Sequence, residues 1–143
     1  MEKDFTLEDH LCFSLYASSR AILRMYQPLL KKLDITYPQY LVLQALWEAE
    51  KQTIKQLGET LDLDTGTLTP LLKRMEAKQL ISRQRSKEDE RVVHVTLTDQ
   101  GEALKQEAAC IPLALVSSSG MSSEEIDQLN RLVKKLTTNL QQR

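Results

Sequence analysis

Residues 53–78, TIKQLGETLDLDTGTLTPLLKRMEAK, contain two short amphipathic segments separated by a tight break. The capping pattern TIKQ at their start predicts a helix over residues 53–61. Residues 62–66, DLDTG, interrupt this helix, and a second helix is expected over residues 64–78. Two short helices joined by a tight turn, with small hydroxyl residues early in the second and cations late, are typical of a helix-turn-helix.

The residues that follow change from helical to alternating periodicity. Residues 80–85, LISRQR, and residues 92–97, VVHVTL, each predict a strand, and the second is rich in β-branched side chains. Between them, residues 87–90, KEDE, predict a polar turn. We therefore expect a β-hairpin wing directly after the helix-turn-helix.

Two amphipathic helices are expected before this region. A cap at Thr6 opens the first helix, and Pro28 is expected to kink it near its end. A buried second helix is expected from Pro38 to Ala49. The apolar residues of the first helix recur at helical spacing and are Leu11, Leu15, Ile22, Met25 and Leu29.

Two more helices are expected after the wing. Thr98 caps a fifth helix that runs to about Ala109, and Pro112 limits or kinks it. Residues 122–125, SSEE, predict a capping box for the last helix. The apolar stripe of that helix requires a partner surface, in the same chain or in a second copy, and consists of Ile126, Leu129, Leu132, Val133, Leu136 and Leu140.

The order of these elements predicts a mostly α-helical fold with a small β-hairpin wing. Residues 35–98 are expected to form a winged helix-turn-helix that binds DNA. Residues 1–34 and 99–143 are expected to form helices that dimerise, integrated with it in a single unit. The length of 143 residues, 41% of them hydrophobic, is that of one ordinary domain with a core.

Composition excludes several classes of protein. With 19 Lys and Arg against 20 Asp and Glu, the net charge is −1, so the chain is not a polycation. It contains no uncharged run long enough to cross a membrane, and its first ten residues are acidic where a signal peptide is basic. Two cysteines, 98 positions apart, are too few for a disulfide scaffold or a four-ligand zinc site. We expect a soluble, cytoplasmic protein without a metal or other cofactor, whose cysteine chemistry is reactive rather than structural.

The charges are distributed unevenly along the chain. Residues 73–85 contain five cations and one anion, so their net charge is +4 although that of the whole chain is −1. A basic patch confined to the second helix of the helix-turn-helix and the first wing strand suits contact with DNA phosphates, whereas the alternative is a solvated helix face. The cations expected to contact DNA are Lys73, Arg74, Arg83 and Arg85.

Short hydroxyl side chains near the start of the second helix are further candidates for DNA contact. Thr65, Thr67 and Thr69 lie where base edges or phosphates would approach, although each is individually more common as a helix cap or an exposed neutral residue. Arg91, at the wing tip, is placed to enter a minor groove.

Several motifs resemble a known family. Residues 64–75, DTGTLTPLLKRM, followed by Asp89-Glu90-Arg91, resemble the winged helix-turn-helix of the MarR family of bacterial regulators. Residues 11–20, LCFSLYASSR, and residues 37–40, YPQY, are similar to its organic hydroperoxide-sensing branch, the OhrR repressors, and the match extends from Leu7 to Pro112. The resemblance implies a homodimer that binds a palindromic DNA operator to repress a peroxidase gene. It also implies release of the DNA when an organic hydroperoxide oxidises a cysteine near the N-terminus.

Cys12 is the candidate for this redox sensor, although a cysteine in a Leu-rich helix is more often a small core residue. Tyr16 follows four residues later on the same helix face, and Tyr26 shares that face further along. Phenol donors directed at a sulfur favour its thiolate, which is the form that attacks a peroxide. The helix dipole is expected to help little, because a helix capped at Thr6 leaves Cys12 beyond its first turn.

The spacing of these residues sets a geometric condition. At about 1.5 Å rise per residue, Cys12 and Tyr26 lie about 21 Å apart along one straight helix. An antiparallel crossing of two first helices would bring Tyr26 of one subunit to Cys12 of the other. Tyr37 follows the helix break and is free to turn toward the same place. The resemblance implies that the tyrosines matching Tyr26 and Tyr37 bond the reactive sulfur from the partner chain.

Cys110 lies in the expected fifth helix, beside Ile111 and Pro112. In the resembling branch, two-cysteine forms carry a resolving cysteine close to such an Ile-Pro pair, and we interpret this chain as that form. Cys12 would become a sulfenic acid that Cys110, of the other subunit, captures as a disulfide. Because a disulfide needs Cα atoms within about 7 Å, its formation would move the helices and rotate the DNA-reading regions. The alternative for Cys110 is a small buried residue beside a proline.

Two other functions compete with a redox-sensing repressor. The first is an enzyme, a thiol peroxidase that uses the same cysteine pair, and repeated turnover would identify it. The second is a MarR-type regulator controlled by a non-covalent phenolic ligand, which would respond to that ligand without Cys12. His10 and His94 lie far apart without a carboxylate pattern, so we expect no metal site. The sequence also contains no Gly-rich phosphate loop or nucleophile elbow, and we expect a repressor and not an enzyme.

Overall fold

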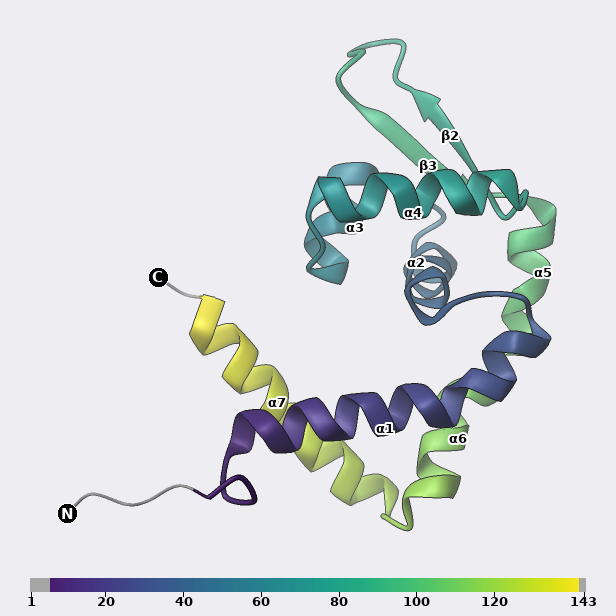
Figure 1. Cartoon of the computed structure of the whole chain (residues 1–143). Coiled ribbons are helices and arrows are strands. Elements are labelled where there is room, and N and C mark those ends of the chain that lie inside the picture. Colours follow the sequence, from purple (N-terminus) through teal and green to yellow (C-terminus); the bar gives the residue numbers. More distant parts are fainter. Residues whose placement is uncertain (1–5, 142–143) are drawn as a thin grey trace. The chain divides into compact units, whose positions relative to one another are not determined.

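The computed structural model describes residues 6–141 (Figure 1). Residues 1–5 and 142–143, the outer ends of the two segments expected to dimerise, lie outside the described residues. The elements in chain order are α1 (Leu11–Lys32), α2 (Tyr37–Glu48), β1 (Lys51–Thr53), α3 (Ile54–Leu61), α4 (Thr65–Ala77), β2 (Ile81–Arg85), β3 (Val93–Leu97), α5 (Asp99–Ala108), α6 (Cys110–Ser119) and α7 (Ser123–Gln141).

These elements form two compact units along the chain, Met1–Ala109 and Cys110–Arg143. The first unit contains α1, α2, the helix-turn-helix formed by α3 and α4, the sheet with the wing, and α5. The second consists of α6 and α7. The predicted mostly helical fold with a winged helix-turn-helix is confirmed. Among the helices of residues 6–141, none is both long and apolar enough to cross a membrane.

Capping boxes define where α2 and α3 begin. The Thr36 hydroxyl accepts from the Gln39 N–H at 3.3 Å, while the Gln39 side chain accepts from the Thr36 N–H at 3.1 Å. Thr53 and Gln56 form the same reciprocal pair at 3.0 and 2.9 Å, as the TIKQ pattern predicts. Both pairs satisfy N–H groups that a helix start otherwise leaves without acceptors.

The core of the first unit lies between α2, the helix-turn-helix and the sheet. Leucines dominate it because they combine good helix propensity with a large apolar side chain. The largest side chains that are fully buried in this unit are Leu43, Leu46, Leu57, Leu68, Leu72, Met75 and Ile81.

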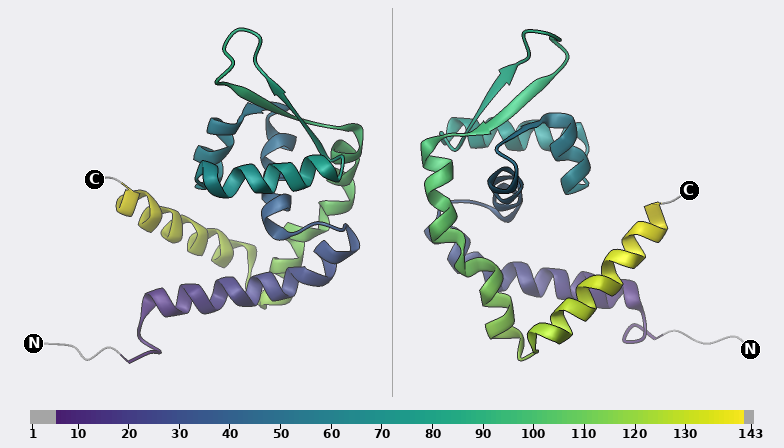
Figure 2. Two further views of the ribbon diagram at one scale, coloured as in Figure 1. Left: turned by 45° about the horizontal axis from the view of Figure 1, so that its top comes forward. Right: turned by 180° about the vertical axis from the view of Figure 1, so that it is seen from behind.

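The wing belongs to a three-stranded antiparallel sheet with the order β1-β3-β2. The expected hairpin of β2 and β3 is present and extends beyond α4 in both views of Figure 2. Strand β1 was not predicted from the sequence; it pairs with β3 through Thr53 opposite His94. With only three residues, β1 is too short to show the alternation that reveals a strand.

The first helix begins later than expected. Instead of capping it, the Thr6 hydroxyl donates to the Asp9 carboxylate at 3.0 Å within a separate turn, and α1 begins at Leu11. His10 takes the N-cap position without a capping bond from its side chain. As a result, Cys12 is the second residue of α1, and the expectation that it lies beyond the first turn is wrong. Pro28 lies inside the helix, near its C-terminal end.

The expected fifth helix is divided in two. Helix α5 ends at Ala108, and α6 begins at Cys110, so Pro112 lies in the first turn of a new helix. Proline is tolerated there because its missing N–H would have no acceptor within the helix. The capping box before α7 is present: the Glu125 N–H donates to the Ser122 hydroxyl at 3.1 Å, and the Glu125 side chain accepts from the Ser122 N–H at 3.0 Å.

Candidate nucleic-acid interface and cysteine sites

The N-terminal end of α4 presents hydroxyl side chains to solvent. Asp64 caps the helix by accepting from the Thr67 N–H at 2.7 Å, and this bond lowers the pKa of the Asp64 carboxyl. Thr65 and Thr67 are exposed, whereas Thr69 is half-buried. Of the three threonines expected to contact DNA, the first two are therefore the more accessible.

A tight turn fixes α4 relative to α3. Asp62 ends α3 in the left-handed conformation, with φ of 55°, and the Leu63 N–H donates to the Gly58 carbonyl at 2.9 Å. A Cβ atom on Gly58 would lie 2.8 Å from the Leu63 carbonyl oxygen, which is too close for any other residue. Gly58 thus permits the turn that sets the direction of α4 relative to α3.

Arg91 is held at the tip of the wing by its neighbour Asp89. Two guanidinium nitrogens of Arg91 donate to the two Asp89 carboxylate oxygens at 3.1 and 3.2 Å, and the Arg91 backbone N–H adds a bond at 3.1 Å. These bonds lower the pKa of the Asp89 carboxyl. Because the Arg91 side chain is still 90% exposed, Asp89 orients the guanidinium without removing it from contact with a partner.

The basic patch of residues 73–85 separates into two groups in the structure. Lys73 and Arg74 are exposed on α4 and face solvent. Arg83 instead bonds the Glu76 carboxylate at 3.0 Å and lowers the pKa of that carboxyl, which links β2 to α4. Arg85 donates to the Glu90 carbonyl oxygen at 2.6 Å across the wing.

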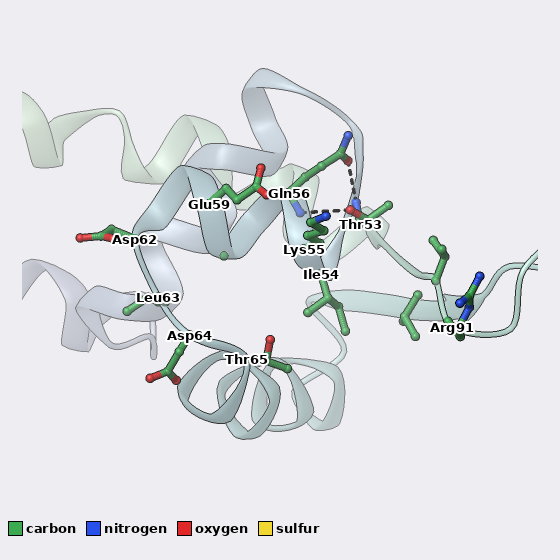
Figure 3. A pocket seen from close by; sticks show the side chains of 13 residues that line it. Thr53, Ile54, Lys55, Gln56, Glu59, Asp62, Leu63, Asp64, Thr65 and Arg91 are labelled. Atoms are coloured by element: carbon green, nitrogen blue, oxygen red, sulfur yellow. Dashed lines mark hydrogen bonds between the residues drawn. The ribbon is translucent and has the colours of Figure 1, made fainter. Parts of the chain in front are cut away.

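An open groove of about 1,300 Å³ lies between the start of α3, the start of α4 and the wing (Figure 3). Thr65 and Arg91, two of the predicted DNA contacts, both line it. Lys55, which the sequence analysis did not select, lines the same groove and is exposed. Lys55 lies 18 residues before the basic patch that begins at Lys73, so only the folded arrangement associates it with the interface.

The charges of this groove differ between its sides. Three carboxylates, those of Glu59, Asp62 and Asp64, line it together with the cations Lys55 and Arg91. In Figure 3, Asp62 and Asp64 lie on the side opposite Arg91. Because carboxylates repel phosphate, the side with Lys55 and Arg91 is the one suited to the DNA backbone.

Cys12 is an exposed thiol in the first turn of α1. The N–H groups of a first helical turn have no acceptor within the helix, so they remain available to a group that approaches this position. Tyr16 lies one turn further along the same helix and is also exposed. Its ring packs beneath the Arg20 guanidinium, whose central carbon is 5.5 Å from the ring centroid.

Tyr26 and Tyr37 lie together, one on α1 and the other at the start of α2. Their rings stack with centroids 5.8 Å apart. Burial raises the pKa of both phenols, and for Tyr26 the neighbouring Tyr37 adds a smaller contribution in the same direction. Both hydroxyls therefore stay protonated at neutral pH and are able to donate hydrogen bonds.

Cys110 is an exposed thiol and the first residue of α6. Cys110 is therefore not a small buried residue, which was the alternative considered from the sequence. The adjacent Ile111 is fully buried. Cys12 and Cys110 belong to different units of the chain. Both positions are accessible to small reagents, as oxidation chemistry requires.

Comparison with known proteins shows extensive similarity to bacterial transcriptional regulators. A family model described as transcriptional regulator SarA/Rot matches residues 24–108. Over 137 residues, the chain is 53% identical to the organic hydroperoxide resistance transcriptional regulator of Bacillus subtilis. The aligned region covers 96% of this chain and 93% of that protein.

Solved structures of similar proteins include complexes with DNA. Reduced AbfR bound to DNA matches with a TM-score of 0.78 and 39% identity, covering 94% of this chain and 92% of AbfR, a Staphylococcus epidermidis protein. Disulfide-formed AbfR matches with a TM-score of 0.65, 37% identity and 92% of each chain. A mutant MarR from E. coli complexed with operator DNA matches with a TM-score of 0.80 and 28% identity, covering 94% of this chain and 99% of MarR.

Proposed function

This chain belongs to the MarR family of winged helix-turn-helix transcriptional regulators, in its organic hydroperoxide resistance branch, and from that premise we propose that it is a DNA-binding repressor switched by oxidation of Cys12. The observation that carries the proposal is the position of Cys12, an exposed thiol in the first turn of α1. The relatives are transcriptional regulators, which favours this function over a thiol peroxidase.

The DNA-binding surface consists of the start of α4 and the wing. Thr65 and Thr67 approach base edges or phosphates in a major groove, and Lys73 and Arg74 neutralise phosphates along α4. Arg91, oriented by Asp89, enters the flanking minor groove. Thr69, Arg83 and Arg85 contribute less, because Thr69 is half-buried and the two arginines already have partners within the chain.

The functional form is a homodimer that binds a palindromic operator. Each unit leaves large apolar side chains exposed, such as Leu11 on α1 and Leu132 on α7, at 59% and 67%. Such side chains are stabilised when a second copy covers them. We assign residues 1–34 and 99–143 to dimerisation and residues 35–98 to DNA binding. A dimer also allows Tyr26 and Tyr37 of one subunit to donate to Cys12 of the other, while Tyr16 donates from the same helix.

The switch is a two-electron oxidation by an organic hydroperoxide. The Cys12 thiolate attacks the terminal peroxide oxygen, the O–O bond breaks, an alcohol leaves and Cys12 becomes a sulfenic acid. The thiol of Cys110, from the partner subunit, then attacks the Cys12 sulfur, forming the disulfide and releasing water. In total, two thiols are oxidised while the hydroperoxide is reduced to alcohol and water. Closing this bond moves the helices that carry the DNA-reading regions and releases the operator.

The test compares wild type with Cys12→Ser. A palindromic duplex is selected from random DNA with the reduced wild-type protein, and binding is then followed by fluorescence anisotropy during addition of cumene hydroperoxide. Wild type should release the duplex after about one equivalent of hydroperoxide per Cys12, and Cys12→Ser should bind equally well but not respond. Equal release by both proteins would contradict sensing by Cys12. Continued consumption of peroxide with a reductant would instead indicate a peroxidase.

A further inference from the structure

One cation of the basic patch, Lys78, has a side chain that is 35% exposed but bonds groups of the protein itself. Its ammonium group donates to the backbone carbonyl oxygen of Asp34 at 2.5 Å and to the side-chain carbonyl oxygen of Gln39 at 3.3 Å. The Asp34 carboxylate is 4.0 Å away and 95% exposed, so it contributes little beside these two bonds. Lys78 therefore contacts the turn between α1 and α2.

The acceptors of Lys78 lie in a rigid part of the chain. Asp34 adopts the left-handed conformation, with φ of 56°, which ends the α1 segment. Gln39 is 2% exposed, and the same side-chain oxygen also accepts from the Thr36 N–H that caps α2. Tyr37 lies between these two capping residues. A displacement of the Tyr37 backbone would therefore act on the capping box that holds this oxygen.

The other end of this link is the C-terminus of α4. Lys78 is the C-cap residue, and its backbone N–H bonds the carbonyl oxygens of Arg74 and Glu76. The next residue, Gln79, has φ of 64°, and its carbonyl oxygen accepts from the Thr98 hydroxyl at 2.5 Å. The Lys78 backbone is thus fixed to α4 while its side chain is fixed to the α1–α2 turn.

An open pocket adjoins this link. It has a volume of about 440 Å³ and is lined by residues that include Leu30, Tyr37 and Lys78. The two hydrogen bonds of Lys78 connect the α1–α2 turn to α4 at the edge of this space.

We propose that Lys78 is a positioning residue that couples the α1–α2 turn to the orientation of α4, and that it is not a DNA contact. This role rests on the proposed function, in which Tyr37 responds to the oxidation state of Cys12 of the partner subunit. When the turn moves, Lys78 moves the C-terminal end of the DNA-reading helix with it. Lys78 thus transmits the redox signal within one subunit.

The first test measures coupling in Lys78→Met, in which methionine keeps an apolar stem but removes the ammonium donor. Operator affinity is measured for the reduced and the cumene hydroperoxide-treated protein over a range of salt concentrations. The reduced variant should bind within about three-fold of wild type with an unchanged salt slope, because no phosphate contact is lost. The ratio of oxidised to reduced dissociation constants should fall at least about five-fold, since that ratio measures coupling.

Lys73→Met is the matched control, because Lys73 is an exposed cation on the same helix. It should bind the operator more weakly, with a salt slope lower by about one, and keep the wild-type ratio of dissociation constants. Asp34→Asn should behave as wild type, because Lys78 bonds the backbone carbonyl there. If Lys78→Met instead loses salt slope like Lys73→Met, or keeps the full ratio, the positioning role is wrong.

A second measurement needs no variant. Acylation of lysines in the reduced wild-type protein, followed by mass spectrometry, should label Lys78 several-fold more slowly than Lys73, because the Lys78 ammonium is hydrogen-bonded. Equal labelling would overturn the inference even if Lys78→Met fails to fold. Failure of the proposed function is distinguishable, because wild type would then keep its operator affinity after peroxide while Lys78 remained protected.

Discussion

The rings of Tyr26 and Tyr37 stack with centroids 5.8 Å apart and planes 13° from parallel. One residue belongs to α1 and the other opens α2, so the stack joins the helix of the proposed sensor to the segment that leads into the DNA-binding region. Offset stacking of this kind contributes about 0.5–1.5 kcal/mol beyond the burial of the rings. The two hydroxyls are thereby held as a pair.

Replacing Tyr37 by Phe separates the role of the hydroxyl from that of the ring. The stack with Tyr26 is kept, so the melting temperature should change by only a few degrees. Oxidation of Cys12 by cumene hydroperoxide should slow about ten-fold, the effect of one hydrogen bond to a charged sulfur worth about 1.4 kcal/mol. Stopped-flow measurement of the reaction rate checks this result, and an unchanged rate would exclude Tyr37 as a donor to Cys12.

The ion pair between Glu76 and Arg83 makes a prediction about acid stability. Arg83 holds the pKa of the Glu76 carboxyl below its ordinary value of 4.5, so the folded state binds this proton less readily than the unfolded state. The contribution of the pair to stability is therefore fully present above about pH 4.5 and is lost as the pH falls through the lowered pKa. Glu76→Gln should lower the melting temperature by a few degrees at pH 7, since such partly exposed pairs contribute about 0.2–1 kcal/mol.

The same comparison is then repeated in acid. The difference in melting temperature between wild type and Glu76→Gln should begin to shrink below about pH 4.5 and approach zero as the pH falls through the lowered pKa of Glu76, because the wild-type side chain is then neutral, as glutamine is in the variant. A difference that stays constant down to pH 3 would mean that packing, and not charge, is responsible for the effect of the substitution.

Much of the fold followed from local patterns in the sequence. The caps at Thr53 and Ser122 are side-chain signals that act within three residues, so they mark helix starts without knowledge of the fold. Thr6 shows the weakness of such signals. It has the residue type of a cap, but its hydroxyl bonds Asp9, and only the folded chain reveals that α1 begins at Leu11.

The candidate site was less predictable, because the sequence gives the number of charged residues but does not show which groups their side chains contact. Lys78 and Arg83 belong to the same basic run as Lys73, and only the structure shows that they bond Gln39 and Glu76. Lys55 reaches the groove through a long-range arrangement that no local pattern reveals.

Arg91 and Asp89 should act as a pair in DNA binding. Arg91→Ala should weaken operator binding by about 1–3 kcal/mol and alter the preference at flanking A·T pairs, because a minor-groove arginine is lost. Asp89→Asn should weaken binding less, since it leaves the arginine in place but loosens its orientation. Anisotropy titrations at two salt concentrations check both. If Arg91→Ala binds as wild type at low and at high salt, the wing does not contact DNA.

Gly101 is required by the close approach of Leu80, the residue that precedes β2. A Cβ atom at this position would lie 2.2 Å from the Leu80 carbonyl oxygen, and the Trp47 indole donates to the Gly101 carbonyl at 3.0 Å. Gly101→Ala should lower the free energy of unfolding by about 2–3 kcal/mol, because backbone must shift to relieve the overlap. Chemical denaturation followed by the fluorescence of Trp47, the single tryptophan, measures this change.

Gly66→Ala is the matched control for that substitution. A Cβ atom on Gly66 would meet its nearest neighbour, an Asp64 carboxylate oxygen, at an ordinary distance of 3.5 Å. Because alanine favours helix over glycine by up to about 1 kcal/mol, this variant should be as stable as wild type or more stable. Destabilisation by both substitutions to a similar extent would mean that overlap with Leu80 is not the cause.

Cys110→Ser distinguishes a two-cysteine switch from a one-cysteine switch. The variant should still form a sulfenic acid at Cys12, because the peroxide reaction does not use Cys110. It should release DNA less completely than wild type and should progress to sulfinic acid under excess peroxide, since no thiol captures the intermediate. Mass spectrometry and a non-reducing gel identify these products. Wild type should give a covalent pair of subunits on that gel, and Cys110→Ser should remain single chains. If Cys110→Ser instead releases the operator as completely as wild type, oxidation of Cys12 alone is sufficient for the switch.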